Sequence, residues 1–378
     1  MSPQATGWAG RSWRADPGRG PLEVSQPMEY GIALSAGADA WRWVQRAEAL
    51  GFSHAWFYDT QMLCADPFVA MAAAAVHTSR IRLGTGVLIP SNRIAPVAAN
   101  ALASLNRLAP GRIVCGIGTG FTARRTMGQT AVKLAELREY VRVLRGLLAG
   151  EVVEWSSEGR SRKVRFLNPE LGLIDLESPV PIYVGAMGPK ARALAAEIGE
   201  GWINFALAHP AALADVGSTL EAWRAAGQDP SDCHSAGFTL GCILAEGEPC
   251  DSARARAQAG PLAAVAFHNL METPLPGPLP PELDALVSRY REFYERYEPA
   301  DARYLNLHRG HLMFLRPEEE PLIGPELIRN LTFTGTEAEL RERLGELEDA
   351  GYRQWVIQLV PGQEQAIEDW ARLLLSGS

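Results

Sequence analysis

The chain has 378 residues, of which 47% are hydrophobic and 21% charged, and its net charge is −8. This is the composition of a globular protein, long enough for one large α/β barrel or two smaller domains. The acidic balance gives no basic footprint for nucleic acid, and no apolar run approaches the roughly 18 residues that a membrane span needs. We therefore expect a small-molecule partner, no nucleic acid and no membrane.

The first 28 residues are rich in Gly, Pro, Arg and Trp and lack the continuous apolar segment of a secretory signal. They are predicted to form a mobile N-terminal tail (residues 1–28) ahead of a single barrel domain (residues 29–378), and we expect the protein in the cytoplasm. The five cysteines are widely spaced and include no CxxC pair. They indicate neither a disulfide framework nor a zinc site, and no metal is expected.

Short β-prone runs alternate with helical stretches rich in Ala and Leu, which is typical of βα units around a parallel sheet. A helix over residues 38–50 has most of its apolar side chains on one face, with Gly51 as its C-cap, and Asp66 and Pro67 open the next helix. The predicted strands are Tyr30–Leu34, His54–Tyr58, Ile81–Val87, Arg112–Ile117, Ile182–Gly185, Trp202–Phe205, Ser235–Leu244 and Gln354–Val360. Eight strands in a chain of this length favour a single (β/α)8 TIM barrel over a doubly wound sheet.

Two insertions interrupt the repeat. Residues 151–179, before strand five, carry scattered charges and glycines and are predicted to cross the barrel mouth. Residues 260–325, before strand eight, are longer and contain the run TPLPGPLPP followed by a helical stretch over residues 282–297. Insertions of this size in a compact barrel are usually functional, so both are candidates for lids or interfaces.

Glycine marks three of the predicted strand ends, where the chemistry of such barrels is located. Strand three lies in RIRLGTGVLIPSN, strand four ends in GIGTGF, and strand five ends in GAMGPK. Because glycine has no Cβ, a flat ligand can lie against the backbone at these ends. Tight βα turns are an equally good explanation of the strand-four glycines.

The GAMGPK stretch leads directly into a helix with a proline at its start. Such a turn exposes free backbone N–H groups at the positive end of the helix dipole, and Lys190 adds charge. The pattern favours a phosphate site, although such barrels more often bind phosphate after strands seven and eight. A plain helix start is the alternative.

Candidates for substrate chemistry are few. Asp59 follows strand two, where it could contact a ligand or simply cap the next loop. His308 and His311 stand three apart in the second insertion, where either could act as a general acid or contact the substrate. Surface or packing histidines are the alternative, and a metal pair lacks an evident third ligand nearby.

Four stretches taken in order resemble the bacterial-luciferase-like superfamily: AEALGFSHAWFYDTQ, DPFVAMAAAAVHTSRIRLGTGV, LNRLAPGRIVCGIGTGFTARRTMG and PVPIYVGAMGPKARALAAEIGEGWI. The branch they resemble most is that of the deazaflavin-dependent methylenetetrahydromethanopterin reductases. The resemblance resumes near the C-terminus at LTFTGTEAELRERLGELEDAGYRQWVIQ. It implies a (β/α)8 barrel that binds FMN or coenzyme F-420 at the C-terminal ends of its strands, commonly as a homodimer.

The resemblance also implies which residues contact the cofactor. In such enzymes strand three often ends in a bulge with a non-prolyl cis peptide behind the isoalloxazine-type ring, and the matching bond here is Gly86–Val87. Strand four supplies ring and ribityl contacts, and the loop after strand five holds the phosphate. The matching positions are Gly86, Val87, Gly118, Thr119, Gly120, Ala186, Met187, Gly188 and Pro189.

The resemblance favours F-420-dependent hydride transfer to a small organic substrate, because the TGFTARRTMG segment is closer to the reductase branch than to the luciferases. A reduced-FMN-dependent monooxygenase is the alternative, followed by a non-catalytic flavin-binding protein. The reductases tend to carry an acidic residue on strand one. Residues Gly31 to Leu34 include none, which argues against a pterin substrate.

Overall fold

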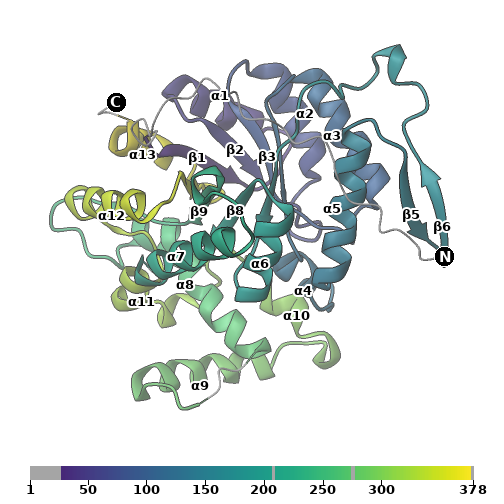
Figure 1. Ribbon diagram of the computed structural model, residues 1–378. Coiled ribbons are helices and arrows are strands. Elements are labelled where there is room, and N and C mark those ends of the chain that lie inside the picture. Colours follow the sequence, from purple (N-terminus) through teal and green to yellow (C-terminus); the bar gives the residue numbers. More distant parts are fainter. Residues whose placement is uncertain (1–26, 207–208, 274–276, 376–378) are drawn as a thin grey trace.

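In a computed structural model of the chain, the structure describes residues 27–206, 209–273 and 277–375. Within these ranges, eight parallel strands close into a barrel in the order β1-β12-β9-β8-β7-β4-β3-β2 (Figure 1). They are β1 (Glu29–Leu34), β2 (His54–Phe57), β3 (Arg82–Leu88), β4 (Ile113–Ile117), β7 (Ile182–Gly185), β8 (Gly201–Phe205), β9 (His234–Thr239) and β12 (Gln354–Gln358). The predicted (β/α)8 barrel is confirmed, and each predicted strand has a counterpart in it.

Helices surround the barrel, with α7 beside α12 and α13 beside α1 (Figure 1). Those of the ring are α1 (Trp41–Leu50), α2 (Pro67–His77), α3 (Ala95–Leu108), α4 (Phe121–Arg125), α5 (Leu134–Leu148), α6 (Pro189–Ile198), α7 (His209–Ala225), α12 (Glu337–Ala350) and α13 (Ala366–Leu375). The second insertion adds α8 (Ala253–Glu272), α9 (Pro281–Glu295), α10 (Tyr304–Leu307) and α11 (Pro325–Leu331).

Local sequence explains several helix ends. Helix α1 stops at Gly51, whose φ of 104° is the left-handed conformation that glycine adopts without strain. Helix α2 starts at Asp66, whose carboxylate accepts the first free backbone N–H groups, and Pro67 fills the first turn. Thr336 and Glu339 form a reciprocal capping box at the start of α12. The caps at Gly51 and Asp66 confirm the prediction.

The interior of the barrel is filled by a cluster that includes Trp56, Tyr183 and Phe238. Trp56 explains one glycine of the third strand, because a Cβ on Gly84 would collide with its indole ring. The backbone approach at Gly84 therefore serves core packing, whereas Gly86 lies beside a cavity described below. Of the two glycines that interrupt this strand, only Gly86 is placed to meet a ligand.

Strand seven is shorter than predicted. Strand β9 ends at Thr239 instead of Leu244, and beyond it the carbonyls of Leu240 and Cys242 accept the N–H groups of Phe333 and Gly335. Gly241 permits this close approach, because a Cβ there would collide with the backbone of Phe333. Beyond this point β10 (Ile243–Leu244) leaves the barrel and pairs with β11 (Gly335–Thr336). Both pieces include buried apolar residues, so the sequence reads as one continuous strand.

The first insertion lies at the opposite end of the barrel from the predicted position. It contains the antiparallel hairpin β5 (Val153–Ser157) and β6 (Arg160–Val164), which projects from the barrel at the right of Figure 1. The segment between β6 and β7 is bonded to the C-terminal half of α3, where the side-chain amide of Asn106 donates to the carbonyl of Ser178. A segment that joins a helix to the next strand emerges at the N-terminal end of the strands, so it cannot cross the mouth as predicted.

The second insertion has its own apolar core, formed by α8, α9 and α11. It begins inside α8, a helix that starts at Ala253, ahead of the predicted boundary at residue 260. The predicted helix over residues 282–297 is confirmed as α9. Because the insertion follows β9, it emerges at the C-terminal end of the strands, where the barrel mouth lies.

The predicted tail over residues 1–28 lies outside the described residues except for its last two. Of these, Met28 is buried, and its backbone N–H donates to Glu348. Among the described residues, no helix combines the length and the hydrophobicity that a bilayer crossing requires.

Candidate functional site

A cavity of about 170 Å³ opens where β3 bulges at the C-terminal end of the barrel. Its walls come from the ends of β1, β2, β3, β8 and β12, from the start of α4 and from the second insertion. The lining residues are Ser35, Tyr58, Asp59, Thr60, Leu63, Cys64, Gly86, Val87, Ile89, Gly120, Phe121, Thr122, Ala123, Phe205, His311, Leu312, Met313 and Gln358. Predicted candidates from strands two, three and four and from the insertion thus meet in one place.

The end of β3 has the geometry that the resemblance implied. The peptide bond between Gly86 and Val87 is cis, and the register between β3 and β4 shifts between Thr85 and Leu88. Both Gly86 and Val87 line the cavity. The expectation of a bulge with a non-prolyl cis peptide is confirmed, and their contact with a cofactor stays a prediction.

The strand-four glycines divide into two kinds. A Cβ on Gly118 would lie 2.8 Å from Cγ2 of Val87, so this glycine makes room for the β3 bulge. Thr119 uses its carbonyl to accept the N–H of Val132 at 2.8 Å. Only Gly120, with a φ of 80° at the start of α4, lines the cavity among these three positions.

The predicted phosphate loop follows β7 and lies next to the bulge, because a Cβ on Gly185 would be 3.5 Å from Val87. Gly188 is the N-cap of α6, no side chain caps this helix, and a Cβ on Gly188 would meet nothing within 4 Å. Met187 is exposed, whereas Ala186 is buried and accepts the indole N–H of Trp202. With Pro189 in its first turn, α6 has an open N-terminus suited to an anion.

Asp59 is almost fully buried in the cavity wall, and both of its carboxylate oxygens are bonded. One accepts the backbone N–H of Ile89 at 3.0 Å, and the other accepts the guanidinium of Arg93, also at 3.0 Å. Arg93 in turn bridges to Asp66 at the start of α2. These bonds favour a role in holding the segment after β3, and a catalytic role for Asp59 stays a prediction.

His308 and His311 are brought together with a third histidine, His268 of α8, and all three are buried. One ring nitrogen of each lies within 4.8 Å of a ring nitrogen of each of the others. Nδ1 of His268 is 2.9 Å from Nδ1 of His311, and Nε2 of His311 is 3.2 Å from the hydroxyl of Thr122 in the cavity wall. The sequence missed His268 because it lies 40 residues before His308, on a different helix.

Two carboxylates hold this cluster from outside. Nε2 of His268 contacts Glu319 at 2.8 Å, and Nε2 of His308 contacts Glu272 at 2.8 Å. Burial alone would raise the pKa of Glu319, but hydrogen bonds from His268 and Arg316 lower it to about 2. Burial lowers the pKa of His268, and lowers that of His311 well below its usual value. At neutral pH His268 and His311 are therefore neutral and Glu319 is ionised.

Two polar groups of the cavity wall were not predicted and have no hydrogen-bond partner among the described residues. They are the hydroxyl of Tyr58 and Oε1 of Gln358. Burial raises the pKa of Tyr58 well above its usual value, so the phenol stays protonated and can donate a hydrogen bond. Tyr58 is the last residue of the predicted second strand and Gln358 lies two residues before the predicted end of the eighth, and this position near a strand end was the available signal.

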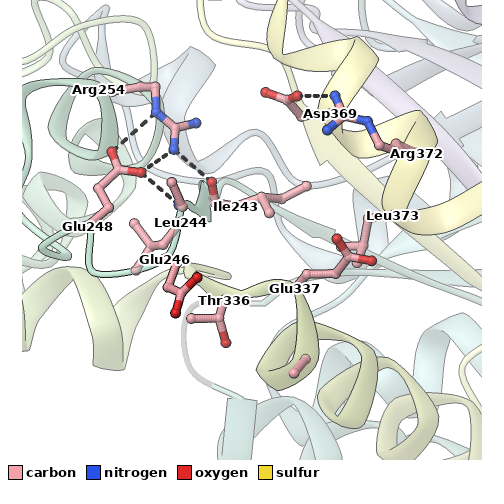
Figure 2. A pocket seen from close by; sticks show the side chains of 12 residues that line it. Ile243, Leu244, Glu246, Glu248, Arg254, Thr336, Glu337, Asp369, Arg372 and Leu373 are labelled. Atoms are coloured by element: carbon pink, nitrogen blue, oxygen red, sulfur yellow. Dashed lines mark hydrogen bonds and ion pairs between the residues drawn. The ribbon is translucent and has the colours of Figure 1, made fainter.

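A larger hollow, of about 750 Å³, lies outside the barrel between β10, β11 and α13 (Figure 2). Its charged side chains are largely satisfied by one another: Arg254 binds Glu248 and the carbonyl of Ile243, and Arg372 pairs with Asp369. The hydrogen bond from Arg254 lowers the pKa of Glu248 to about 2. The larger hollow shares no lining residue with the cavity at Gly86. We place the candidate site at the smaller cavity, where the predicted residues meet.

Residues 21–354 match the model of a protein family described as luciferase-like monooxygenase. One curated relative, the F-420-dependent hydroxymycolic acid dehydrogenase of Mycobacterium tuberculosis, is 32% identical over 49% of this chain and 55% of its own length. A second, the 5,10-methylenetetrahydromethanopterin reductase of Methanolobus tindarius, is 31% identical over 58% of this chain and 64% of its own length. The chain thus spans a little over half the length of the curated relatives it matches.

Among solved structures, the coenzyme F-420-dependent tetrahydromethanopterin reductase of Methanopyrus kandleri superposes with a TM-score of 0.67 at 21% identity. The match covers 93% of this chain and 99% of that chain. At this identity the likeness concerns the fold, and it extends over nearly the whole barrel with its insertions.

Proposed function

Because the chain belongs to the luciferase-like monooxygenase family, we propose that it is an oxidoreductase that moves a hydride between coenzyme F-420 and a small organic substrate. The observation that carries the proposal is the cavity built on the Gly86–Val87 bulge at the C-terminal end of the barrel. The named relatives support F-420 over FMN, since one is called F-420-dependent and the solved structure likewise.

The residues present fit such a cofactor in two places. A planar ring could lie against the backbone of Gly86 and Val87, which both line the cavity, and a phosphate could accept the free backbone N–H groups near Gly188. At about 170 Å³ the cavity is smaller than the roughly 300 Å³ of common ligand pockets, so it would hold only part of such a cofactor. When bound, the deazaflavin would supply the hydride chemistry.

The protein's own groups then orient the substrate. The protonated hydroxyl of Tyr58 can donate a hydrogen bond, and Oε1 of Gln358 can accept one. His311 lines the same cavity beside Thr122, where it can contact the substrate. A reduced-FMN monooxygenase is the second candidate, because the family description names that activity.

A fluorescence titration with F-420 and with FMN tests the proposal, and we expect the tighter affinity for F-420. Gly188→Asp places a negative charge beside the proposed phosphate and should weaken binding by about tenfold or more. Gly345→Asp, at a site on α12 where a Cβ also meets nothing within 4 Å, is the matched control. Equal affinity of Gly188→Asp and the parent for both cofactors would place the phosphate elsewhere.

The two activities are separated by oxygen uptake. A monooxygenase consumes oxygen when reduced FMN and substrate are supplied, whereas a deazaflavin enzyme turns over substrate under anaerobic conditions. We also propose a cytoplasmic homodimer, as expected from the resemblance. Light scattering of the purified protein checks the dimer, and a mass equal to one chain would contradict it.

A further inference from the structure

We infer that His268, His308 and His311 form a binding site for a divalent transition metal such as Zn²⁺ in the wall of the cavity. The three side chains come from two separate elements of the second insertion and are all buried. Three histidines with an open fourth position are a common zinc arrangement. The inference stands on this cluster and not on the identity of the cofactor.

The arrangement of the outer nitrogens supports metal binding. Nε2 of His268, of His308 and of His311 contacts Glu319, Glu272 and Thr122, respectively. A metal-binding imidazole usually donates its second N–H to a carboxylate, a carbonyl or water, which fixes the ring and its tautomer. With a proton on each Nε2, all three Nδ1 atoms carry lone pairs.

The Nδ1 atoms of the three histidines allow two explanations of the cluster, a bound metal or a shared proton. Nδ1 of His268 and Nδ1 of His311 are 2.9 Å apart, so the two rings would separate by a few tenths of an ångström to reach the roughly 3.3 Å between two nitrogens that bind one tetrahedral zinc at about 2.0 Å. A single shared proton could also join this pair. It would leave Nδ1 of His308 unexplained, since that atom is buried and has no hydrogen-bond partner among the described residues.

The charges around the cluster indicate what would complete the coordination. Each outer carboxylate also pairs with an arginine, Glu272 with Arg125 and Glu319 with Arg316, and Arg316 has Glu318 as a second partner. A dication held by neutral imidazoles would present positive charge to the cavity, which His311 lines. We expect the fourth ligand to be water, hydroxide or an anionic substrate oxygen, such as an alkoxide or a carboxylate.

Metal analysis of the purified full chain tests the site. After chelation and titration with Zn²⁺, we expect one equivalent to bind, and Co²⁺ in its place should give visible absorption bands of a low-coordinate site. His308→Asn and His268→Asn should each abolish this binding, whereas His77→Ala, at an exposed residue at the end of α2, should retain it. Thermal unfolding of each variant shows whether it is folded.

A milder variant covers the case in which a histidine replacement unfolds the insertion. Glu272→Gln keeps the shape of the outer partner of His308 and should weaken zinc binding by about 10- to 100-fold. Absence of stoichiometric Zn²⁺ in the parent, or unchanged binding in folded His308→Asn, would overturn the site. In the second case the metal would lie elsewhere, for example at Glu29, His54 and His234, a second cluster that could hold an ion. No cofactor is used, so the result is independent of the proposed hydride transfer.

Discussion

The two insertions of this barrel have contrasting roles. The first, around β5 and β6, joins a helix to a strand and packs at the N-terminal end, where its hairpin is largely exposed. The second, from α8 to α11, joins a strand to a helix and brings His311, Leu312 and Met313 to the cavity. An insertion between a strand and the following helix can reach the site, whereas one between a helix and the following strand cannot. The type of connection therefore matters more than the length or composition of the insertion.

The largest effect is expected when the second insertion loses its buried charge pair. Glu319→Gln leaves the buried Arg316 with only the partly exposed Glu318 as a counter-charge and should lower the free energy of unfolding by up to about 5 kcal/mol. Glu139→Gln, which breaks the exposed pair with Arg142, should cost at most about 1 kcal/mol. Denaturant unfolding of both variants measures the difference, and equal costs would contradict the burial of the pair between Arg316 and Glu319.

The same pair predicts how stability depends on pH. The pKa of Glu319 falls from its ordinary value of 4.5 to about 2 in the folded protein. Its stabilising contribution is therefore present above about pH 4.5 and is lost as the pH falls toward 2. The difference in unfolding free energy between the parent and Glu319→Gln should narrow as the pH falls across this interval. A constant difference would show that the partners of Glu319 do not lower its pKa.

The next largest effect is expected from a substitution in the wall of the cavity. A Cβ on Gly86 would lie 3.2 Å from Cβ of Trp56, so the branched side chain in Gly86→Val must crowd the core or enter the cavity. We expect cofactor affinity to fall by about tenfold or more. Gly37→Val, at a position where a Cβ meets nothing within 4 Å, is the control for titration. Unchanged affinity of Gly86→Val would mean that the ring does not lie against β3.

A smaller effect is expected at the unpartnered phenol of the wall. Tyr58→Phe removes a buried hydroxyl that has no partner within the described structure, so the stability of the fold should hardly change. Turnover should nevertheless fall by about tenfold, the value of one hydrogen bond made to the substrate or cofactor. Steady-state kinetics measures the turnover and thermal unfolding measures the stability. Lower stability with unchanged turnover would show that the Tyr58 hydroxyl supports the fold and does not contact the substrate or cofactor.

The smallest effect is expected in the first insertion. Replacing residues 154–163 by a short glycine linker removes the exposed hairpin and keeps Val153 against Gly146 of α5. Because this segment lies at the far end of the barrel, cofactor affinity should stay within about twofold of the parent value. A large loss would show that the N-terminal end of the barrel is coupled to the mouth.

Much of the fold and part of the site followed from the sequence. The strand alternation, the Gly51 and Asp66 caps and the bulge at Gly86–Val87 depend on local chemistry and on motifs in one stretch of chain. The position of residues 151–179 and the end of β9 were predicted wrongly. Each is set by contacts between distant segments, such as that of Gly241 with Phe333.

The barrel and the glycine-rich ends of its strands could be predicted from the sequence, because backbone periodicity and glycine conformation are local properties. Only the tertiary structure decided that His268 joins His308 and His311, that Glu319 and Glu272 hold them, and that Tyr58 lacks a partner. Hydrogen bonding and burial depend on which side chains meet, and here they meet from segments far apart in the chain.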